Sequence, residues 1–298
     1  MARVANRQCP KCNEVGRDKD SDHLFLMRDG ETWCCNKPYH DLYLERHGDL
    51  IDRSQVTEMQ GNLSFKEIKR LPFFGNDSRG ITPETHTAFK VRTELSEIDR
   101  SPISIYYPEL HKGKHQSYKK RKLPKSFSVV KEGPIDIPDY FGQWKCPTHG
   151  KRLLICAGEE DTLAAYQMLK EKYPDYEPCV VGLPRGEGGS VETVAENLAF
   201  TRNFENIILA MDMDEAGRKA LAQLAPIFGE GVQSLVLSEN DIGDMLVKGK
   251  HKEFINAYFS AKEYRPANIL VVSDILEDAV QPVPWGLSYP WSRLTELT

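Results

Sequence analysis

Residues 206–219 read NIILAMDMDEAGRK, and this stretch decides the fold of the region around it. An apolar run typical of a buried strand ends here in two aspartates, Asp212 and Asp214, and a helical pattern follows. Similar apolar runs, separated by helical patterns, occur on both sides: RLLIC from Arg152, CVVGL from Cys179 and SLVL from Ser234, with helices beginning near Thr162, Ser190 and Glu215. Strands that alternate with helices predict a small, Rossmann-like parallel α/β sheet within residues 151–262.

Acidic residues follow three of these strands. Carboxylates two residues apart on an extended chain face the same way, and the carboxyl ends of parallel strands meet at one edge of the sheet. Like charges gathered there would repel one another unless a divalent cation neutralised them. We therefore expect an acidic catalytic site made of Glu159, Asp161, Asp212, Asp214 and Asp241. We expect Glu159, Asp212 and Asp214 to hold Mg²⁺ or Mn²⁺. Any one acidic turn alone could simply cap a helix, and we expect Glu160 and Glu215 to be helix-cap or solvent residues.

A second group of candidate ligands lies near the N-terminus. Cys9 and Cys12 have the two-residue gap that presents two thiolates to one tetrahedral metal, and Zn²⁺ is the natural occupant. Cys34 and Cys35 are adjacent, so on a strand they point to opposite faces and only one of them can easily be a ligand. The sequence predicts one structural zinc ion held by Cys9, Cys12, Cys34 and His40, with Cys35 as the alternative third ligand.

Composition narrows the class of protein. The chain has 298 residues, seven cysteines and a net charge of -5. It contains no long apolar run of the kind that spans a membrane or forms a signal peptide, so we expect a cytoplasmic protein with reduced cysteines and no membrane partner. The CPTH sequence at Cys146–His149 has the spacing of a metal pair but no second pair near it, and we expect it to be structural.

Positive charge is concentrated in one block. Residues 111–125, HKGKHQSYKKRKLPK, hold seven lysines and arginines and no acidic residue. Such a block could neutralise phosphate groups, although a solvated basic loop is the alternative. The block lies within residues 65–150, where Thr82 and Pro83 predict a helix start and short strands predict an α+β subdomain.

The predicted organisation has five parts. They are a zinc-binding domain at 1–50, a linker at 51–64, an α+β subdomain at 65–150, the parallel sheet at 151–262, and a C-terminal segment at 263–298. In the first part, Leu24–Met27 and Thr32–Trp33 predict a hairpin with a turn at Asp29 and Gly30.

These motifs, in this order, resemble the primase part of the phage primase-helicases. The resemblance rests on CPKC, DGETWCC, SRGIT, the basic block, YFGQW, AGEEDTLAA, AMDMDEAGRKA and GLSYPW. It implies a zinc ribbon that reads a template trinucleotide and a Toprim domain whose acids hold metal ions, while basic residues hold nucleotides and template. The residues that match this basic motif are Lys119, Arg121 and Lys125, which makes them candidates for binding nucleotides and DNA. Trp33 and His23 on the hairpin are candidate base contacts. The implied partners are single-stranded DNA, ribonucleoside triphosphates, a helicase domain in cis or in trans, and a replicative DNA polymerase.

The sequence departs from the family pattern in three places. Ala157 stands where the family has a glutamate before the Toprim glycine, and Glu159 is the candidate substitute. His40 stands where a fourth cysteine is commoner. The chain also lacks the phosphate-binding loop of a helicase, so we expect SDILEDAV, at 273–280, to be a linker helix before a helicase domain that is absent.

Two functions from different classes follow. The first is a DNA primase, an enzyme that synthesises short RNA primers on single-stranded DNA for lagging-strand replication. The second is a non-catalytic zinc and Toprim module that binds single-stranded DNA, and Ala157 is its main support. A nuclease or topoisomerase is a weaker third, because no tyrosine nucleophile can be located.

Overall fold

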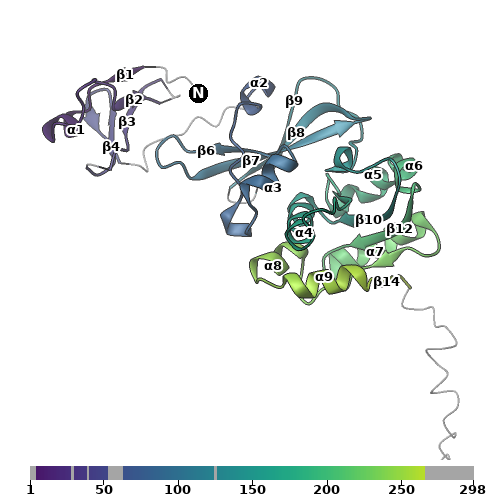
Figure 1. Cartoon of the computed structure of the whole chain (residues 1–298). Coiled ribbons are helices and arrows are strands. Elements are labelled where there is room, and N and C mark those ends of the chain that lie inside the picture. The colour runs from purple at the N-terminus through teal and green to yellow at the C-terminus, as the bar shows by residue number, and fades with distance from the viewer. Residues whose placement is uncertain (1–4, 28–29, 39, 53–62, 124–125, 266–298) are drawn as a thin grey trace, which may run out of the picture. The chain divides into compact units, whose positions relative to one another are not determined.

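The structure is a computed structural model that describes residues 5–27, 30–38, 40–52, 63–123 and 126–265. The chain divides into a compact unit, Met1–Glu263, and a second unit, Tyr264–Thr298. Three separate sheets form in the compact unit (Figure 1), which confirms the predicted fold class of a small ribbon, an α+β part and a parallel sheet. The predicted turn at Asp29, most of the linker, Lys125 and the predicted linker helix lie outside the described residues.

The N-terminal sheet is antiparallel, with its five strands in sequence order. Its elements are β1 (Asn6–Arg7), α1 (Pro10–Glu14), β2 (Leu24–Leu26), β3 (Thr32–Cys35), β4 (Tyr43–Arg46) and β5 (Asp49–Leu50). The predicted hairpin is the β2–β3 pair, in which Phe25 lies opposite Cys34. Alternation along β3 sends Cys34 into a cluster with Phe25 and Leu44, and Cys35 into a second cluster with Cys9 and Cys12. Two very small cores result, so this domain depends on something more than burial of apolar surface.

The second sheet is a four-stranded antiparallel meander. It comprises β6 (Arg92–Leu95), β7 (Pro102–His111), β8 (Lys114–Lys122) and β9 (Ser126–Lys131), preceded by α2 (Phe65–Ile68), the 3-10 helix η2 (Asp77–Arg79) and α3 (Pro83–Ala88). Thr82 caps α3 as predicted, and Ser64 caps α2 in the same way, each accepting a hydrogen bond from a backbone N–H of the first turn. The basic block, for which a loop was one alternative, forms strand β8. Its inner face includes Tyr118, which packs with Tyr106 and Val130.

The third sheet has the order β11-β10-β12-β13-β14, and all its strand pairs are parallel except β13–β14. Its strands are β10 (Gly150–Cys156), β11 (Val180–Gly182), β12 (Phe204–Ala210), β13 (Gln233–Ser234) and β14 (Lys262–Glu263). The helices between and after them are η3 (Gln143–Lys145), α4 (Glu159–Lys172), η4 (Glu187–Gly189), α5 (Ser190–Glu196), α6 (Leu198–Thr201), α7 (Glu215–Phe228), α8 (Ile242–Val247) and α9 (His251–Phe259).

The connections of this sheet explain where its site lies. From the central pair β10 and β12, α4 leads outward to β11 and α7 leads the other way to β13, so the direction of winding reverses between β10 and β12. Helices α4, α8 and α9 contact one another, while α5 contacts α7. In such doubly wound sheets the crevice at the carboxyl ends of the strands, next to the reversal, is the usual ligand site.

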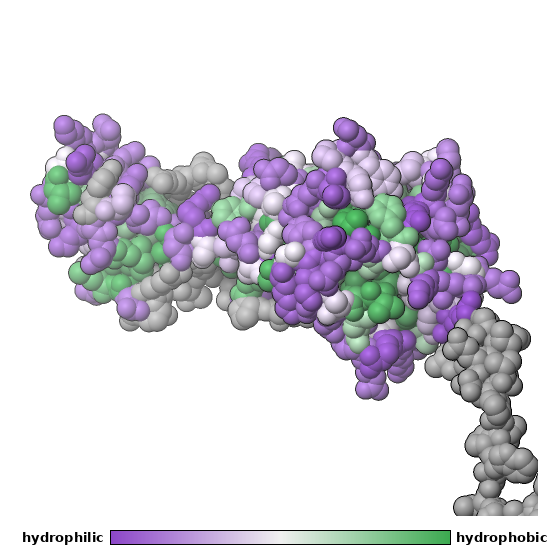
Figure 2. Space-filling view, turned by 60° about the horizontal axis from the view of Figure 1, so that its bottom comes forward, coloured by the Kyte–Doolittle hydropathy of each residue, from purple (hydrophilic) through white to green (hydrophobic). Residues whose placement is uncertain are grey.

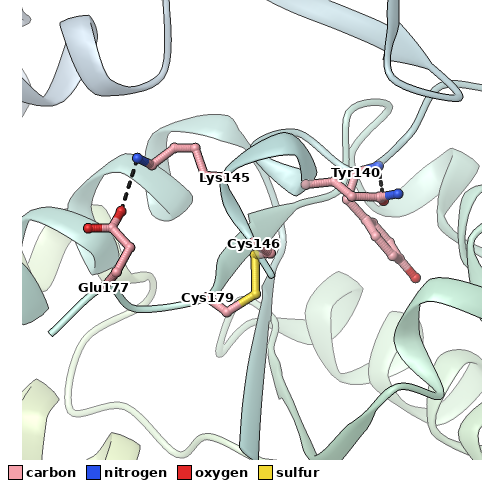
Figure 3. The surroundings of a disulfide bond; sticks show 6 residues. Tyr140, Lys145, Cys146, Glu177 and Cys179 are labelled. Atoms are coloured by element: carbon pink, nitrogen blue, oxygen red, sulfur yellow. Dashed lines mark hydrogen bonds and ion pairs between the residues drawn. A yellow bond between two sulfur atoms is a disulfide. The ribbon is translucent and has the colours of Figure 1, made fainter. Parts of the chain in front are cut away.

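One cysteine pair differs from the expectation of reduced thiols. Cys146 and Cys179 form a disulfide that ties the turn before β10 to the start of β11 (Figure 3). Beside it, Lys145 and Glu177 form an ion pair with an N–O distance of 3.0 Å. The CPTH sequence is therefore structural, as predicted, but as one half of a disulfide. The sequence reasoning missed the bond because the two cysteines are 33 residues apart and only the fold of the sheet brings them together.

The surface agrees with a chain that carries many charged residues. Figure 2 shows that hydrophilic residues cover much of the visible face of the compact unit, with hydrophobic residues gathered in a few patches. Among the described helices, none combines the length and the apolar composition that a membrane crossing requires.

Candidate active site and metal centre

Two ion pairs join β8 to the first turn of α4. Lys119 and Arg121 are two residues apart on β8 and so share one face of the sheet. Lys119 pairs with Glu159, and Arg121 pairs with Glu160. Glu159 and Glu160 are the first two residues of α4, where the partial positive charge of the helix terminus stabilises carboxylates. The basic block and the Toprim acids, far apart in sequence, therefore meet in one place.

The Lys119–Glu159 pair is tightly bonded. Lys119 Nζ donates to both carboxylate oxygens of Glu159, at 2.8 and 2.9 Å, and to the carbonyl oxygen of Pro184 at 2.8 Å. The side chains of Lys119 and Glu159 are only 15% and 8% exposed. Burial raises the pKa of Glu159 above its ordinary value, while the neighbouring Lys119 ammonium acts in the opposite direction. The predicted cation and the predicted acid are thus partners of each other.

Glu160 is the centre of a network, so its expected role as a helix cap or solvent residue is wrong. Its carboxylate accepts hydrogen bonds from Asn76 Nδ2 at 3.1 Å and Tyr107 Oη at 3.4 Å, and pairs with Arg79 Nε at 3.3 Å and with Arg121. These partners come from the η2 turn, β7 and β8, which gives Glu160 contacts with three elements. Arg79, in the SRGIT motif, was missed as a site residue because its ion pair joins positions 81 residues apart.

The remaining acids line the same crevice from the carboxyl ends of the strands. Asp161 is partly buried and accepts a hydrogen bond from Gly243 N at 3.1 Å. Burial, followed by the nearby carboxylates of Asp241 and Asp212, raises its pKa to about 7, although the hydrogen bond from Gly243 acts in the opposite direction. Asp241 also caps α8 by accepting from Asp244 N at 2.6 Å. The negative charges of Asp241 and Asp212 are therefore close enough to disfavour the charged form of Asp161.

Asp214 has a different position from the other predicted acids. It is the N-cap of α7, and its side chain accepts a hydrogen bond from Gly217 N at 2.8 Å. Gly217 is required there, because a Cβ at this position would lie 2.0 Å from Asp212 O. The two aspartates of the MDMDEAG motif thus have different roles: Asp212 lines the cavity, and Asp214 caps the N-terminus of α7.

These side chains surround a cavity of about 710 Å³. The acids on its wall are Glu109, Glu159, Glu160, Asp161, Asp212 and Asp241, and the bases are Arg79, Lys119, Arg121 and Arg185. Phe127, Val129 and Ile135 add an apolar portion, and Ala157 lies on the wall next to the acids. The cavity therefore holds both cations and a larger number of carboxylates, and several of the cations are paired with Glu159 and Glu160.

The carboxylate side fits a divalent cation. Oxygen ligands of this kind suit Mg²⁺, and a cation would remove the repulsion that raises the pKa of Asp161. Among the described residues, the closely spaced sets of candidate metal ligands lie in the N-terminal domain and not here. This agrees with Mg²⁺ sites in general, which use one or two protein carboxylates together with water and substrate phosphates.

The N-terminal domain brings four candidate zinc ligands together: Cys9, Cys12, Cys35 and His40. His40 Nε2 lies 3.4, 3.1 and 3.6 Å from the sulphurs of Cys9, Cys12 and Cys35, and the sulphurs of Cys12 and Cys35 are 3.6 Å apart. A tetrahedral Zn²⁺ with Zn–S bonds of about 2.3 Å separates its ligands by about 3.7 Å, so the set fits this ion.

Cys34, the preferred third ligand in the sequence analysis, is wrong, and the alternative Cys35 is in the cluster. The sequence could show that the two cysteines face opposite ways, but not which face of β3 is turned toward Cys9 and Cys12. Burial raises the pKa of the Cys12 and Cys35 thiols, so a Zn²⁺ ion that binds here would have to displace their protons.

Two neighbours support the cluster. His40 Nδ1 is within hydrogen-bond distance of the carbonyl oxygen of Asp41, which leaves Nε2 as the lone-pair nitrogen. The buried Asp18, which sequence reasoning missed, accepts hydrogen bonds from the backbone N–H groups of Cys9, Asp22 and His23. Asp18 thereby fixes the turn that carries the first ligand pair.

The predicted base contacts lie on or beside the hairpin. Trp33 is partly buried, with the Arg7 guanidinium carbon 4.3 Å from its ring centroid. His23 Nε2 lies 3.9 Å from Asp22 Oδ1, and its side chain is 17% exposed. Both residues are described, but neither has a geometry that by itself identifies a nucleic-acid contact.

Comparison with protein-family models finds a Toprim-like domain at residues 154–246. The chain is 28% identical over 194 residues to the DNA helicase/primase of Enterobacteria phage T3, covering 65% of this chain and 32% of that protein. The chain therefore spans about a third of the length of this relative. The predicted resemblance to the primase part of phage primase-helicases is confirmed.

Solved structures show the same likeness. One is a complex of the bacteriophage T7 lagging-strand DNA polymerase with primase domains bound to an RNA/DNA hybrid and dTTP; the matched chain is 26% identical with a TM-score of 0.56, covering 68% of this chain and 98% of the match. The primase fragment of the T7 primase-helicase has the same fold, with 23% identity, a TM-score of 0.56, and coverage of 86% and 100%.

Proposed function

We propose that this chain, which resembles the primase part of the phage primase-helicases, is a DNA primase that makes short RNA primers on single-stranded DNA. The reaction joins the 3′-hydroxyl of one ribonucleotide to the α-phosphate of the next and releases pyrophosphate. The single observation that supports this most is the meeting of Lys119, Arg121 and Arg79 with the carboxylates of Asp161, Asp212 and Asp241 around one cavity.

The basic and the acidic side chains of the cavity have different roles in this proposal. The cations bind the triphosphate, because Arg and Lys side chains pair strongly with phosphate oxygens in a partly buried site. Asp161, Asp212 and Asp241 would hold Mg²⁺, with Glu159 beside them. The bound ion would supply neutralisation of the charge that develops on the phosphates. Asp214 serves α7 as its cap, and the cavity relies on it only indirectly.

The other partners follow from the same proposal. The Cys9, Cys12, Cys35 and His40 cluster holds one structural Zn²⁺, which the small N-terminal domain needs in place of a larger core. That domain reads the single-stranded template, with Trp33 and His23 as candidate base contacts. A helicase domain in cis or in trans and a replicative DNA polymerase are the proposed protein partners.

A primer-synthesis assay tests the proposal. Zinc-loaded protein, Mg²⁺ and labelled ribonucleoside triphosphates are incubated with pooled single-stranded DNA. We expect short RNA products from the wild type, none from Asp212→Asn, and substantial product from Asp214→Asn, which keeps the capping oxygen of α7. The absence of oligoribonucleotides from wild-type protein under every template and metal condition would contradict primase activity.

Ala157 favours a second candidate function. A methyl group stands on the cavity wall where the family has a carboxylate. If this loss is not compensated, the chain is a non-catalytic module that binds single-stranded DNA through its basic strand. In that case binding survives Asp212→Asn and weakens steeply with salt, while no variant, including Ala157→Glu, makes primers.

A further inference from the structure

One wall of the cavity consists of apolar side chains that the proposed phosphate and metal chemistry does not use. Phe127 and Val129 are two residues apart on β9 and are 49% and 44% exposed. Val130, between them and Lys131, points the other way and packs against Tyr106 and Tyr118. The outer face of β9 is therefore exposed to solvent, although it carries the apolar side chains of Phe127 and Val129.

The neighbours of this bare face are cations. Across the β8–β9 pair, Arg121 lies opposite Phe127 and Lys119 lies opposite Val129. Lys119 Nζ is 5.1 Å from the centroid of the Phe127 ring, and Arg121 Cζ is 5.8 Å from it. The ring therefore stands beside the two side chains proposed to hold phosphates, and all of these residues line one cavity.

We propose that Phe127 is a stacking platform for the base of the ribonucleoside triphosphate whose phosphates lie at Lys119 and Arg121; this inference rests on the proposed function. An exposed aromatic ring next to paired cations is the combination that binds nucleotides, because the cations hold the phosphates and the ring covers the face of the base. Val129 extends the same apolar surface. Every base has such a face, so the platform accepts any of the four and leaves their discrimination to the template.

Charge argues for a nucleotide over an apolar peptide in this place. The same cavity is also lined by Asp161, Asp212 and Asp241, which suit a cation that accompanies phosphates. An apolar peptide side chain on Phe127 would leave these carboxylates without a partner. A metal-bound nucleoside triphosphate has a flat base for the ring, phosphates for the basic side chains and a divalent cation for the carboxylates.

Equilibrium binding tests the inference without relying on catalysis. Zinc-loaded full-length protein is titrated with Mg²⁺ and a non-hydrolysable ATP analogue, and separately with inorganic tripolyphosphate, which has phosphates but no base. We expect Phe127→Ala to weaken binding of the ATP analogue roughly 5- to 100-fold and to leave tripolyphosphate binding unchanged, while Phe127→Tyr binds the analogue nearly as the wild type does. Phe259→Ala is the control, because Phe259 is 48% exposed and lies on α9.

The alternatives give different results. Equal losses for the analogue and tripolyphosphate, or no loss for either, would overturn the inference, as would weakened binding of single-stranded oligothymidylate with unchanged binding of the analogue. The last result would assign the ring to template DNA. A preparation that makes no primers but shows the predicted difference would refute the primase proposal and retain the stacking platform.

Discussion

Replacing Lys119 with methionine removes the charge of a buried ion pair and nearly preserves its shape. Glu159 would then be a buried carboxylate without the ammonium group that donates to both of its oxygens. The folded protein can avoid this charge only by binding a proton. That costs about 1.4 kcal/mol for each pH unit above 4.5, the ordinary pKa of a glutamate side chain. The ceiling at pH 7.5 is therefore about 4 kcal/mol, within the roughly 3–5 kcal/mol typical of breaking a buried pair.

The sign of the pH dependence is fixed by the same reasoning. In Lys119→Met the folded-state pKa of Glu159 rises further above its unfolded value, so the folded state binds more protons and loses stability as pH increases. Urea unfolding followed by circular dichroism at pH 5.5, 6.5 and 7.5 measures this. We expect the stability difference from the wild type to grow by about 1 kcal/mol per pH unit and to fall below about 1 kcal/mol in Lys119→Met/Glu159→Gln. A single variant that loses little at pH 7.5, or a double variant that is not rescued, would refute the reasoning.

Three further predictions concern other parts of the molecule. The Cys35→Ser variant should lose its zinc at a far lower chelator concentration than the Cys34→Ser variant, because Cys35 alone of this pair lies in the ligand cluster. A colorimetric zinc indicator measures the released metal. If both variants lost zinc at the same chelator concentration, the assignment of Cys35 would be contradicted. Burial lowers the pKa of His86 to about 4. Between about pH 6.5 and 4 the unfolded chain therefore binds a proton that the folded chain excludes. The free energy of unfolding should decrease by up to about 3 kcal/mol as the pH falls through this range. His86→Asn keeps an acceptor for Gly75 N and should lack this component in urea unfolding at both pH limits; an unchanged pH profile would exclude His86 as its source. Ala157→Glu should raise primer yield roughly tenfold or more by returning a carboxylate to the cavity wall; an unchanged or lower yield in the primer-synthesis assay would show that position 157 does not limit the reaction.

Much of the parallel sheet could be predicted, because its signals are local. Apolar runs that end in acidic turns identify β10 and β12, and the helices after them follow from spacing alone. A local signal also identified Thr82 as the capping residue of α3. The carboxyl-end acids Asp161, Asp212 and Asp241 were found because parallel strands bring their ends to one edge.

The errors arise where a long-range contact decides. The basic block shows almost no alternation of apolar and polar residues, yet it forms strand β8. Its Lys120 faces inward, where it is paired with Glu94 at 3.6 Å and lies 5.4 Å from the centroid of the Tyr106 ring. A lysine at an inward-facing position interrupts the alternation of apolar and polar residues from which a strand is predicted. Glu160 was misjudged for a similar reason, since the arginines that surround it come from β8 and from η2.

Ala157 and the Lys119–Glu159 pair bear on a single question, which is where the chain would obtain the carboxylate that the resemblance to the phage primase-helicases implies at position 157. Glu159 is on the cavity wall but is engaged by Lys119. A triphosphate that attracts Lys119 would compete with Glu159 for the same ammonium group and so free a carboxylate beside Asp161. By linkage, any metal ion that then uses Glu159 must bind more tightly when the triphosphate is present, and the triphosphate more tightly when the metal is present. The loss of one acid would thereby couple metal binding to nucleotide binding through Lys119.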